Sequence, residues 1–235
     1  MASIYLIRHG QASFGAANYD QLSPLGQRQA DVTGEFCATV GLRFDAAFAG
    51  TLSRQRETGE RVLAGQDSHV ELSIDARFNE INNDEQIEAL LPGLCENDAA
   101  LSAIAAKDKL VSKDYQKIID AVFNAWVSPD CPASNIVSWP NYRDAAHAAV
   151  REVMASVGAG KNTAIFTSGG TIATIVGLVL GVAHTGFYQF YEPVMNCSIT
   201  RLIYSSDRIS LSNFNDVGHL QLLAAQRNES LVTYR

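Results

Sequence analysis

Short apolar runs that end abruptly at polar or glycine residues recur along this chain. The clearest runs are residues 4–7, 45–49 and 163–167, and residues 70–74 form a weaker one. Such short runs with polar breaks predict buried β-strands. Helical spacing follows each clear run, and the first helix is predicted to begin at Ser23-Pro24, a serine N-cap with proline in the first turn. Alternating strands and helices predict an α/β fold, a three-layer α/β/α sandwich around a mostly parallel sheet.

The pattern changes between about residues 85 and 156, where apolar residues recur at helical spacing. Turn signals at Pro92-Gly93 and at residues 128–132 predict helix–turn units within this segment. We interpret it as a helical insertion over the sheet, within a single domain of residues 1–235. Two β-branched segments, residues 198–204 and 208–212, predict an antiparallel hairpin.

The composition is that of a globular protein, with 47% hydrophobic residues and a formal net charge of −7. This acidic balance, without a basic run, argues against a nucleic-acid partner and an anionic membrane surface. The longest apolar run, residues 172–183, is too short to span a bilayer, and no signal-peptide pattern is visible. Four scattered cysteines indicate free thiols in a reducing compartment. We therefore expect a cytoplasmic protein, and the sequence does not predict its oligomeric state.

Chemically related residues stand where the predicted strands end. Arg8, His9 and Gly10 follow the first strand, Arg54 begins the helix after the second, and Ser168-Gly169-Gly170 follow the last central strand. In an open α/β sheet such ends converge on one crevice, where helix N-termini offer free N–H groups to an anion. Each feature alone also fits a surface pair, a solvated arginine or a packing turn. Their combination favours a phosphate site.

Five ordered segments resemble motifs of the histidine phosphatase superfamily, whose founding example is cofactor-dependent phosphoglycerate mutase. They are Arg8-His9-Gly10, residues 22–30 around Ser23-Pro24, residues 51–58 around Arg54, residues 78–81 around Glu80, and residues 196–200 with 215–220. One tripeptide is weak evidence, whereas five segments in the right order identify the chain as a member of this superfamily. The resemblance implies a phosphoglycerate mutase-like fold.

The resemblance also implies a mechanism. His9 would attack a phosphoryl group and hold it as phosphohistidine, while Arg8 and Arg54 stabilise the transferring group. Glu80 would protonate the leaving alcohol, which requires a raised carboxyl pKa. The expected partner is a phosphorylated small molecule or inorganic phosphate, and neither a metal nor an organic cofactor is implied.

One position departs from the family pattern, because Ser168 stands where a second histidine is expected. Ser168 and the Gly169 amide are predicted to bind phosphate as partial substitutes. Removing one preorganised donor typically lowers a rate by about 10²–10³, so we expect reduced activity that Ser168→His would raise. Gln11 and Ser13 are candidate additional phosphate donors, although a polar loop explains them equally well.

Other functions remain open at this level. A phospho-ligand-binding protein with little turnover would use the same pocket. A serine hydrolase is disfavoured, because Phe166 stands where the G-x-S-x-G elbow around Ser168 requires glycine. A phosphoglycerate mutase is also less favoured, because the stretch after Gly10 lacks tryptophan and the lysines of residues 107–117 have a solvated pattern. The preferred function is phosphomonoester hydrolysis.

Overall fold

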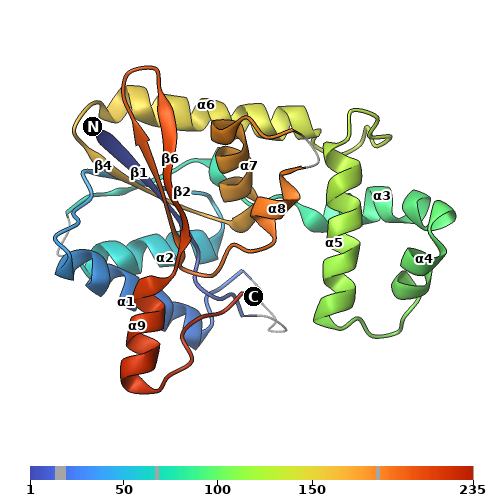
Figure 1. The fold of residues 1–235 in the computed structure, drawn as a ribbon, viewed down its shortest axis with the longest axis horizontal. Coiled ribbons are helices and arrows are strands. Elements are labelled where there is room, and N and C mark those ends of the chain that lie inside the picture. Colours follow the sequence, from blue (N-terminus) through green and yellow to red (C-terminus); the bar gives the residue numbers. More distant parts are fainter. Residues whose placement is uncertain (14–19, 67–68, 184–185, 235) are drawn as a thin grey trace.

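A six-stranded sheet with the order β3-β2-β4-β1-β5-β6 forms the centre of the computed structural model, which describes residues 1–13, 20–66, 69–183 and 186–234 (Figure 1). Its strands are β1 (Ala2–Arg8), β2 (Ala46–Ala49), β3 (Leu72–Ile74), β4 (Asn162–Thr167), β5 (Ile199–Tyr204) and β6 (Ile209–Asp216). The first four pair in parallel, whereas β5 runs antiparallel to both β1 and β6. The predicted α/β class, the mostly parallel sheet and the C-terminal hairpin are confirmed.

Helices cover both faces of the sheet. On one face lie α1 (Pro24–Thr39), α2 (Ser53–Ala64) and α9 (Gly218–Arg227), and on the other lie α6 (Trp139–Val157) and α7 (Gly169–Leu180) (Figure 1). Side chains alternate along β1, so Ile4 and Leu6 pack with α6 and α7, while Ile7 packs with α1 and α2. This alternation gives the sheet two apolar faces and the three predicted layers.

The strand register brings the predicted site segments to one edge of the sheet. Arg8 of β1 lies opposite Thr167 of β4, and Ala49 of β2 lies opposite Phe166. The residues that follow these strands therefore leave the sheet side by side. As predicted, α1 begins after Ser23, whose hydroxyl accepts a hydrogen bond from the Gly26 amide at 3.0 Å.

A third group of helices packs beside the sheet around its own apolar cluster. It contains α3 (Asn83–Asn97), α4 (Ala99–Ala105), α5 (Ser112–Val127) and α8 (Tyr188–Tyr191), and a short 3₁₀ turn, η1 (Ala76–Phe78), precedes it. Figure 1 shows α3, α4 and α5 projecting to one side of the sheet. Trp139 at the start of α6 joins this cluster, whereas Val150 and Val153 pack on the sheet. The segment interpreted as one insertion is therefore divided between two layers.

The predicted turn at Pro92-Gly93 is wrong, because both residues lie inside α3. The helix begins at an Asn82 cap with Asp84 and Glu85 in its first turn, both favourable at a helix N-terminus. Leu90 is buried in the helical cluster, and this packing offsets the missing N–H of the exposed Pro92. The predicted break at residues 128–132 is confirmed by the end of α5 at Val127. Within the described residues, no helix is long and apolar enough to cross a membrane.

Candidate active site

Four of the predicted site residues line one cavity of about 680 Å³ at the carboxyl edge of the sheet. They are Arg8, His9, Arg54 and Glu80, which come from the end of β1, the first turn of α2 and the segment after η1. Gln11, Ser13, Ser168 and Gly169 are not among the described residues that line this cavity. The structure therefore brings together a nucleophile candidate, two cations and an acid.

His9 presents one ring nitrogen with a lone pair. Its Nδ1 lies 2.7 Å from the Gly10 carbonyl oxygen, which only accepts, so Nδ1 carries the proton and donates it. Nε2 is then unprotonated and accepts a hydrogen bond from Arg54 Nε at 3.2 Å. Burial, followed by the charges of Arg54 and Arg8, lowers the pKa of His9 well below its usual 6.5. The imidazole is therefore neutral at pH 7, as a nucleophile must be.

Close packing at Gly10 fixes the position of His9. A Cβ on Gly10 would lie only 2.4 Å from the Gly26 carbonyl oxygen of α1, so glycine is required there. The Gly10 amide donates to Thr58 Oγ1 of α2 at 3.0 Å, and the His9 amide donates to the Thr167 carbonyl of β4 at 2.9 Å. The turn after β1 is thereby joined to α1, α2 and β4.

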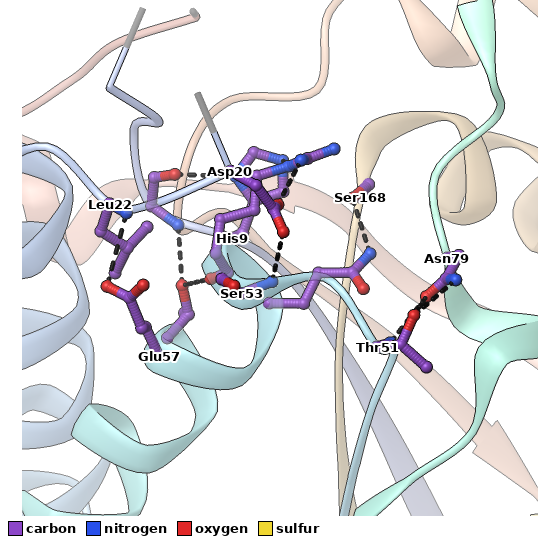
Figure 2. Close-up of polar contacts among 12 residues, drawn as sticks. His9, Asp20, Leu22, Thr51, Ser53, Glu57, Asn79 and Ser168 are labelled. Atoms are coloured by element: carbon purple, nitrogen blue, oxygen red, sulfur yellow. Dashed lines mark hydrogen bonds and ion pairs between the residues drawn. The ribbon is translucent and has the colours of Figure 1, made fainter. Parts of the chain in front are cut away.

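Arg54 is held by a carboxylate that the sequence did not reveal. Asp20 accepts from Arg54 Nη1 at 2.6 Å and from the Ser53 amide at 2.7 Å (Figure 2). Its two oxygens thus bridge the guanidinium and the N-terminus of α2. Asp20 orients Arg54 so that Nε faces His9, and its negative charge lies beside the arginine that a phosphate would contact.

Arg8 is held by the C-terminal end of the chain. Its Nη1 donates to the carbonyls of Val194 and Tyr234, the latter at 2.9 Å, and its guanidinium carbon lies 5.8 Å from the centre of the Tyr234 ring. Gln29 of α1 fixes this end by donating to Thr233 Oγ1 at 2.8 Å. The last described residues therefore help to form the wall of the cavity and to orient its first cation.

Glu80 is placed by a short segment that is tied down at its backbone. The Phe78 carbonyl accepts from Thr167 Oγ1 at 2.6 Å, and the Asn79 carbonyl accepts from Thr171 Oγ1 at 2.7 Å. Glu80 Oε1 in turn accepts from the Gly170 amide at 2.9 Å, in the first turn of α7. Desolvation raises the pKa of Glu80 above its usual 4.5, although Arg54 and Arg8 oppose this change.

Ser168 is fully buried and belongs to a polar contact with α2. Its Oγ accepts a hydrogen bond from Gln55 Nε2 at 2.8 Å (Figure 2), and the same Nε2 donates to the Phe78 carbonyl at 3.1 Å. Gln55 is also fully buried, so its side chain fills the space beside Ser168. That Ser168 and Gly169 bind phosphate, and that Ser168 replaces a family histidine, remain predictions.

This packing changes the expected effect of Ser168→His. The single substitution is expected to lower stability and turnover, because an imidazole would overlap the Gln55 carboxamide in a fully buried site. The double variant Ser168→His with Gln55→Ala provides the space, and its turnover should exceed that of the single variant by about tenfold or more. The measurement is kcat for an aryl phosphate together with Tm for both variants and for Gln55→Ala alone. Additive effects would show that the two positions are independent.

The two predicted donors after Gly10 have local partners. Gln11 Oε1 accepts from Ser23 Oγ at 2.9 Å, and the Ser13 amide donates to the Gln21 carbonyl at 2.8 Å. These contacts support the alternative that both residues organise a polar loop. Their role as phosphate donors stays a prediction. The tryptophan-free stretch weighed against a mutase falls largely on residues 14–19, outside the described residues.

The other histidines do not approach His9 in the described part of the chain. His219 is buried between α9 and α1, where its Nε2 lies 3.0 Å from Thr33 Oγ1 and its ring stacks on Phe36. His147 is exposed on α6 and lies beside a separate, small cavity against α7. His184 lies outside the described residues. Within those residues, no group of three or more His, Cys, Asp or Glu side chains could hold a metal ion.

Comparison with known proteins identifies the class. The family model described as "Histidine phosphatase superfamily (branch 1)" matches this chain over residues 4–90 and 89–217, which together span most of its length. The chain belongs to this superfamily, as its five ordered motifs predicted. The fold places it among phosphoglycerate mutase-like structures.

Two solved structures illustrate this likeness. A mutant phosphoserine phosphatase from Entamoeba histolytica, in complex with phosphoserine, superposes with a TM-score of 0.66 at 18% identity, covering 94% of this chain and 100% of that one. A mycobacterial glucosyl-3-phosphoglycerate phosphatase gives 0.61 at 19% identity, covering 91% and 98%. At these identities the likeness concerns the fold.

A curated relative matches only locally. The mitochondrial serine/threonine-protein phosphatase PGAM5 from Xenopus laevis is 41% identical over 59 residues, which is 24% of this chain and 22% of that protein. The match therefore spans less than a quarter of the relative's length, and it identifies no substrate for this chain.

Sequence reasoning missed several residues that form or support the site. Asp20 and Gln55 hold Arg54 and Ser168, and Tyr234 contacts Arg8. Asn196 donates from Nδ2 to the His9 carbonyl at 3.1 Å. The segments containing Asn196 and Gln55 were part of the family resemblance, which gave neither residue a role, whereas Asp20 and Tyr234 stand in no pattern that indicates a role.

Proposed function

We propose that this protein is a phosphomonoesterase that transfers the phosphoryl group first to His9 and then to water. The observation that supports this proposal most strongly is the unprotonated Nε2 of a neutral His9, which shares one cavity with Arg8, Arg54 and Glu80. Stepwise phosphoryl transfer requires a nucleophile, cations that stabilise the transferring phosphoryl group, and an acid that protonates the leaving group.

In the first step, His9 Nε2 attacks phosphorus and the bond between phosphorus and the ester oxygen breaks. Arg54 exchanges its hydrogen bond to Nε2 for one to a phosphoryl oxygen, and Arg8 neutralises further charge. Glu80 donates its proton to the departing alcohol. The positive ring of phosphohistidine is stabilised by the Nδ1–H hydrogen bond to the Gly10 carbonyl, which is already in place.

In the second step, water attacks the phosphohistidine. The Glu80 carboxylate takes a proton from this water, the bond between phosphorus and Nε2 breaks, and inorganic phosphate leaves. Glu80 is thus protonated again and Nε2 recovers its lone pair. The raised pKa of Glu80 suits this exchange, because the carboxyl group must be an acid in one step and a base in the next.

The decisive experiment combines turnover with trapping of the intermediate. Wild-type protein is expected to hydrolyse an aryl phosphate and, after rapid quenching, to carry an acid-labile, base-stable phosphoryl group. Release of phosphate without any trapped intermediate under single-turnover conditions would contradict the phosphohistidine route. Tight binding of inorganic phosphate without turnover would instead establish the phospho-ligand-binding alternative.

A further inference from the structure

The wall of the cavity that the helical group forms has a distinct chemical character. Its wall comes from the start of α3, from α5 and from α8, and it includes Tyr115, Tyr188 and Tyr191. Tyr191 accepts a hydrogen bond at its hydroxyl from Asn83 Nδ2 at 2.8 Å, and its ring packs 5.6 Å from that of Phe123. Burial raises the pKa of Tyr191 well above 10, so this ring remains neutral.

Two carboxylates stand in the same part of the wall. Asp84 lies in the first turn of α3, and Glu192 follows α8, where its Oε1 accepts a hydrogen bond from Gln116 Nε2. Both residues line the cavity and are exposed to solvent. This wall therefore presents negative charge beside aromatic rings.

The positive charges of the cavity come from the end of β1 and the first turn of α2. Among the described residues that line it, the cations are Arg8 and Arg54, and Arg54 is already paired with Asp20. The lysines of residues 107–117 do not line it, and Lys107 instead pairs with Asp114 at 2.8 Å. A second anionic group placed beside Asp84 and Glu192 would therefore meet carboxylates, and the described lining offers no cation besides the two arginines.

We propose that the substrate is the monophosphate ester of an alcohol that carries an amine or a quaternary ammonium group. The phosphoryl group would lie against Arg8 and Arg54, and the cation would lie among the tyrosine rings near Asp84 and Glu192. Aromatic rings with nearby carboxylates bind alkylammonium groups through cation–π and Coulomb attraction. This assignment rests on the proposed phosphatase function and deepens it by naming the substrate class.

The test compares esters that differ mainly in the charge of the alcohol. Choline phosphate and ethanolamine phosphate carry a cation, glycerol 3-phosphate is neutral in its alcohol part, and 3-phosphoglycerate carries a carboxylate. We expect kcat/KM for the cationic esters to exceed that for glycerol 3-phosphate by about tenfold or more, with 3-phosphoglycerate lowest. The preference should weaken as salt is added. Equal rates, or a preference for 3-phosphoglycerate, would overturn the proposal.

Variants that remove one carboxylate at a time test whether this wall of the cavity causes the preference for cationic esters. Glu192→Gln and Asp84→Asn are each expected to lower the ratio of kcat/KM for choline phosphate over glycerol 3-phosphate by about two- to fivefold. The matched control is Glu88→Gln, which removes an exposed carboxylate of α3 that is not among the described lining residues, and it should leave the ratio unchanged. A ratio that changes equally in all three variants would show that net charge, and not this wall, is responsible.

Binding measurements test the proposed ligand class independently of the proposed phosphatase function. The affinities of the same esters for the His9→Ala variant, measured by calorimetry, should follow the same order without any chemical step. If wild type hydrolyses no ester, phenyl phosphate included, while the affinity order holds, the phosphatase function fails and the ligand class stands. If phenyl phosphate is hydrolysed while affinities are equal, the ligand class fails and the phosphatase function stands.

Discussion

Replacement of His9 by alanine is expected to remove the phosphoenzyme and to lower kcat by on the order of 10⁴ or more. The physical reason is the orientation of one nitrogen. Because Nδ1 donates to the Gly10 carbonyl, only Nε2 can attack, and it faces the cavity beside Arg54. Water in the space left by the ring would have to attack the ester directly, without a covalent intermediate. Rapid-quench trapping and steady-state kinetics measure the two effects.

The matched control for this prediction is His147→Ala. His147 is exposed on α6 and lies beside a different cavity, so its loss removes a histidine without touching the site. This control should retain wild-type turnover and phosphoenzyme formation. Turnover in His9→Ala within about tenfold of wild type, or a phosphoryl group still trapped on that variant, would contradict the assignment of His9. Tm measurements on both variants exclude unfolding as the cause of any loss.

The convergence of Arg8, His9 and Arg54 could be predicted because it follows from local pattern and sheet geometry. Each short apolar run marks a strand, and parallel neighbours deliver their next residues to one edge. The register of β1 against β4 shows this convergence, because it places Arg8 opposite Thr167 at the ends of the two strands. Glu80 did not follow from the same pattern, because no strand ends there. Its family motif identified it, and the backbone contacts of Phe78 and Asn79 explain its position.

The supporting contacts could not be predicted, because they join residues far apart along the chain. Tyr234 reaches Arg8 from the opposite terminus, and Gln55 meets Ser168 across two layers. A periodicity argument describes which face of an element is apolar, but not which polar side chain of another element it meets. The turn predicted at Pro92 was wrong for a related reason. Tertiary packing of Leu90 outweighed the local tendency of proline to interrupt a helix. These contacts determine how His9 and its partners are held.

The environments of His9 and Glu80 move their pKa values toward each other. Desolvation disfavours the charged form of both groups, so it lowers the pKa of the imidazole and raises that of the carboxyl. Phosphorylation of the protein requires neutral His9 and protonated Glu80 together. Activity should therefore fall at low pH as His9 becomes protonated, and fall at higher pH as Glu80 loses its proton, which predicts a bell-shaped pH profile.

Replacement of Glu80 by glutamine is expected to lower kcat for an alkyl phosphate by about 10²–10⁴, the usual contribution of a general acid. Formation of the phosphoenzyme from p-nitrophenyl phosphate should decrease far less, because that leaving group departs as an anion without a proton. The glutamine keeps an oxygen for the Gly170 amide, which now contacts Glu80 Oε1 at 2.9 Å, so the start of α7 stays intact. Stopped-flow and quench measurements of the first step with both esters give the two ratios.

The pH profile distinguishes an acid at Glu80 from a merely structural residue. In wild type, kcat/KM for the alkyl ester declines as the pH rises through the raised pKa of Glu80, whereas Glu80→Gln should lack this decline and keep the acid limb set by His9. Glu85→Gln, which changes an exposed carboxylate in the first turn of α3, is the matched control and should keep both limbs. Equal losses with both esters, together with an unchanged profile, would mean that Glu80 organises the segment between η1 and α3 and that another group supplies the proton.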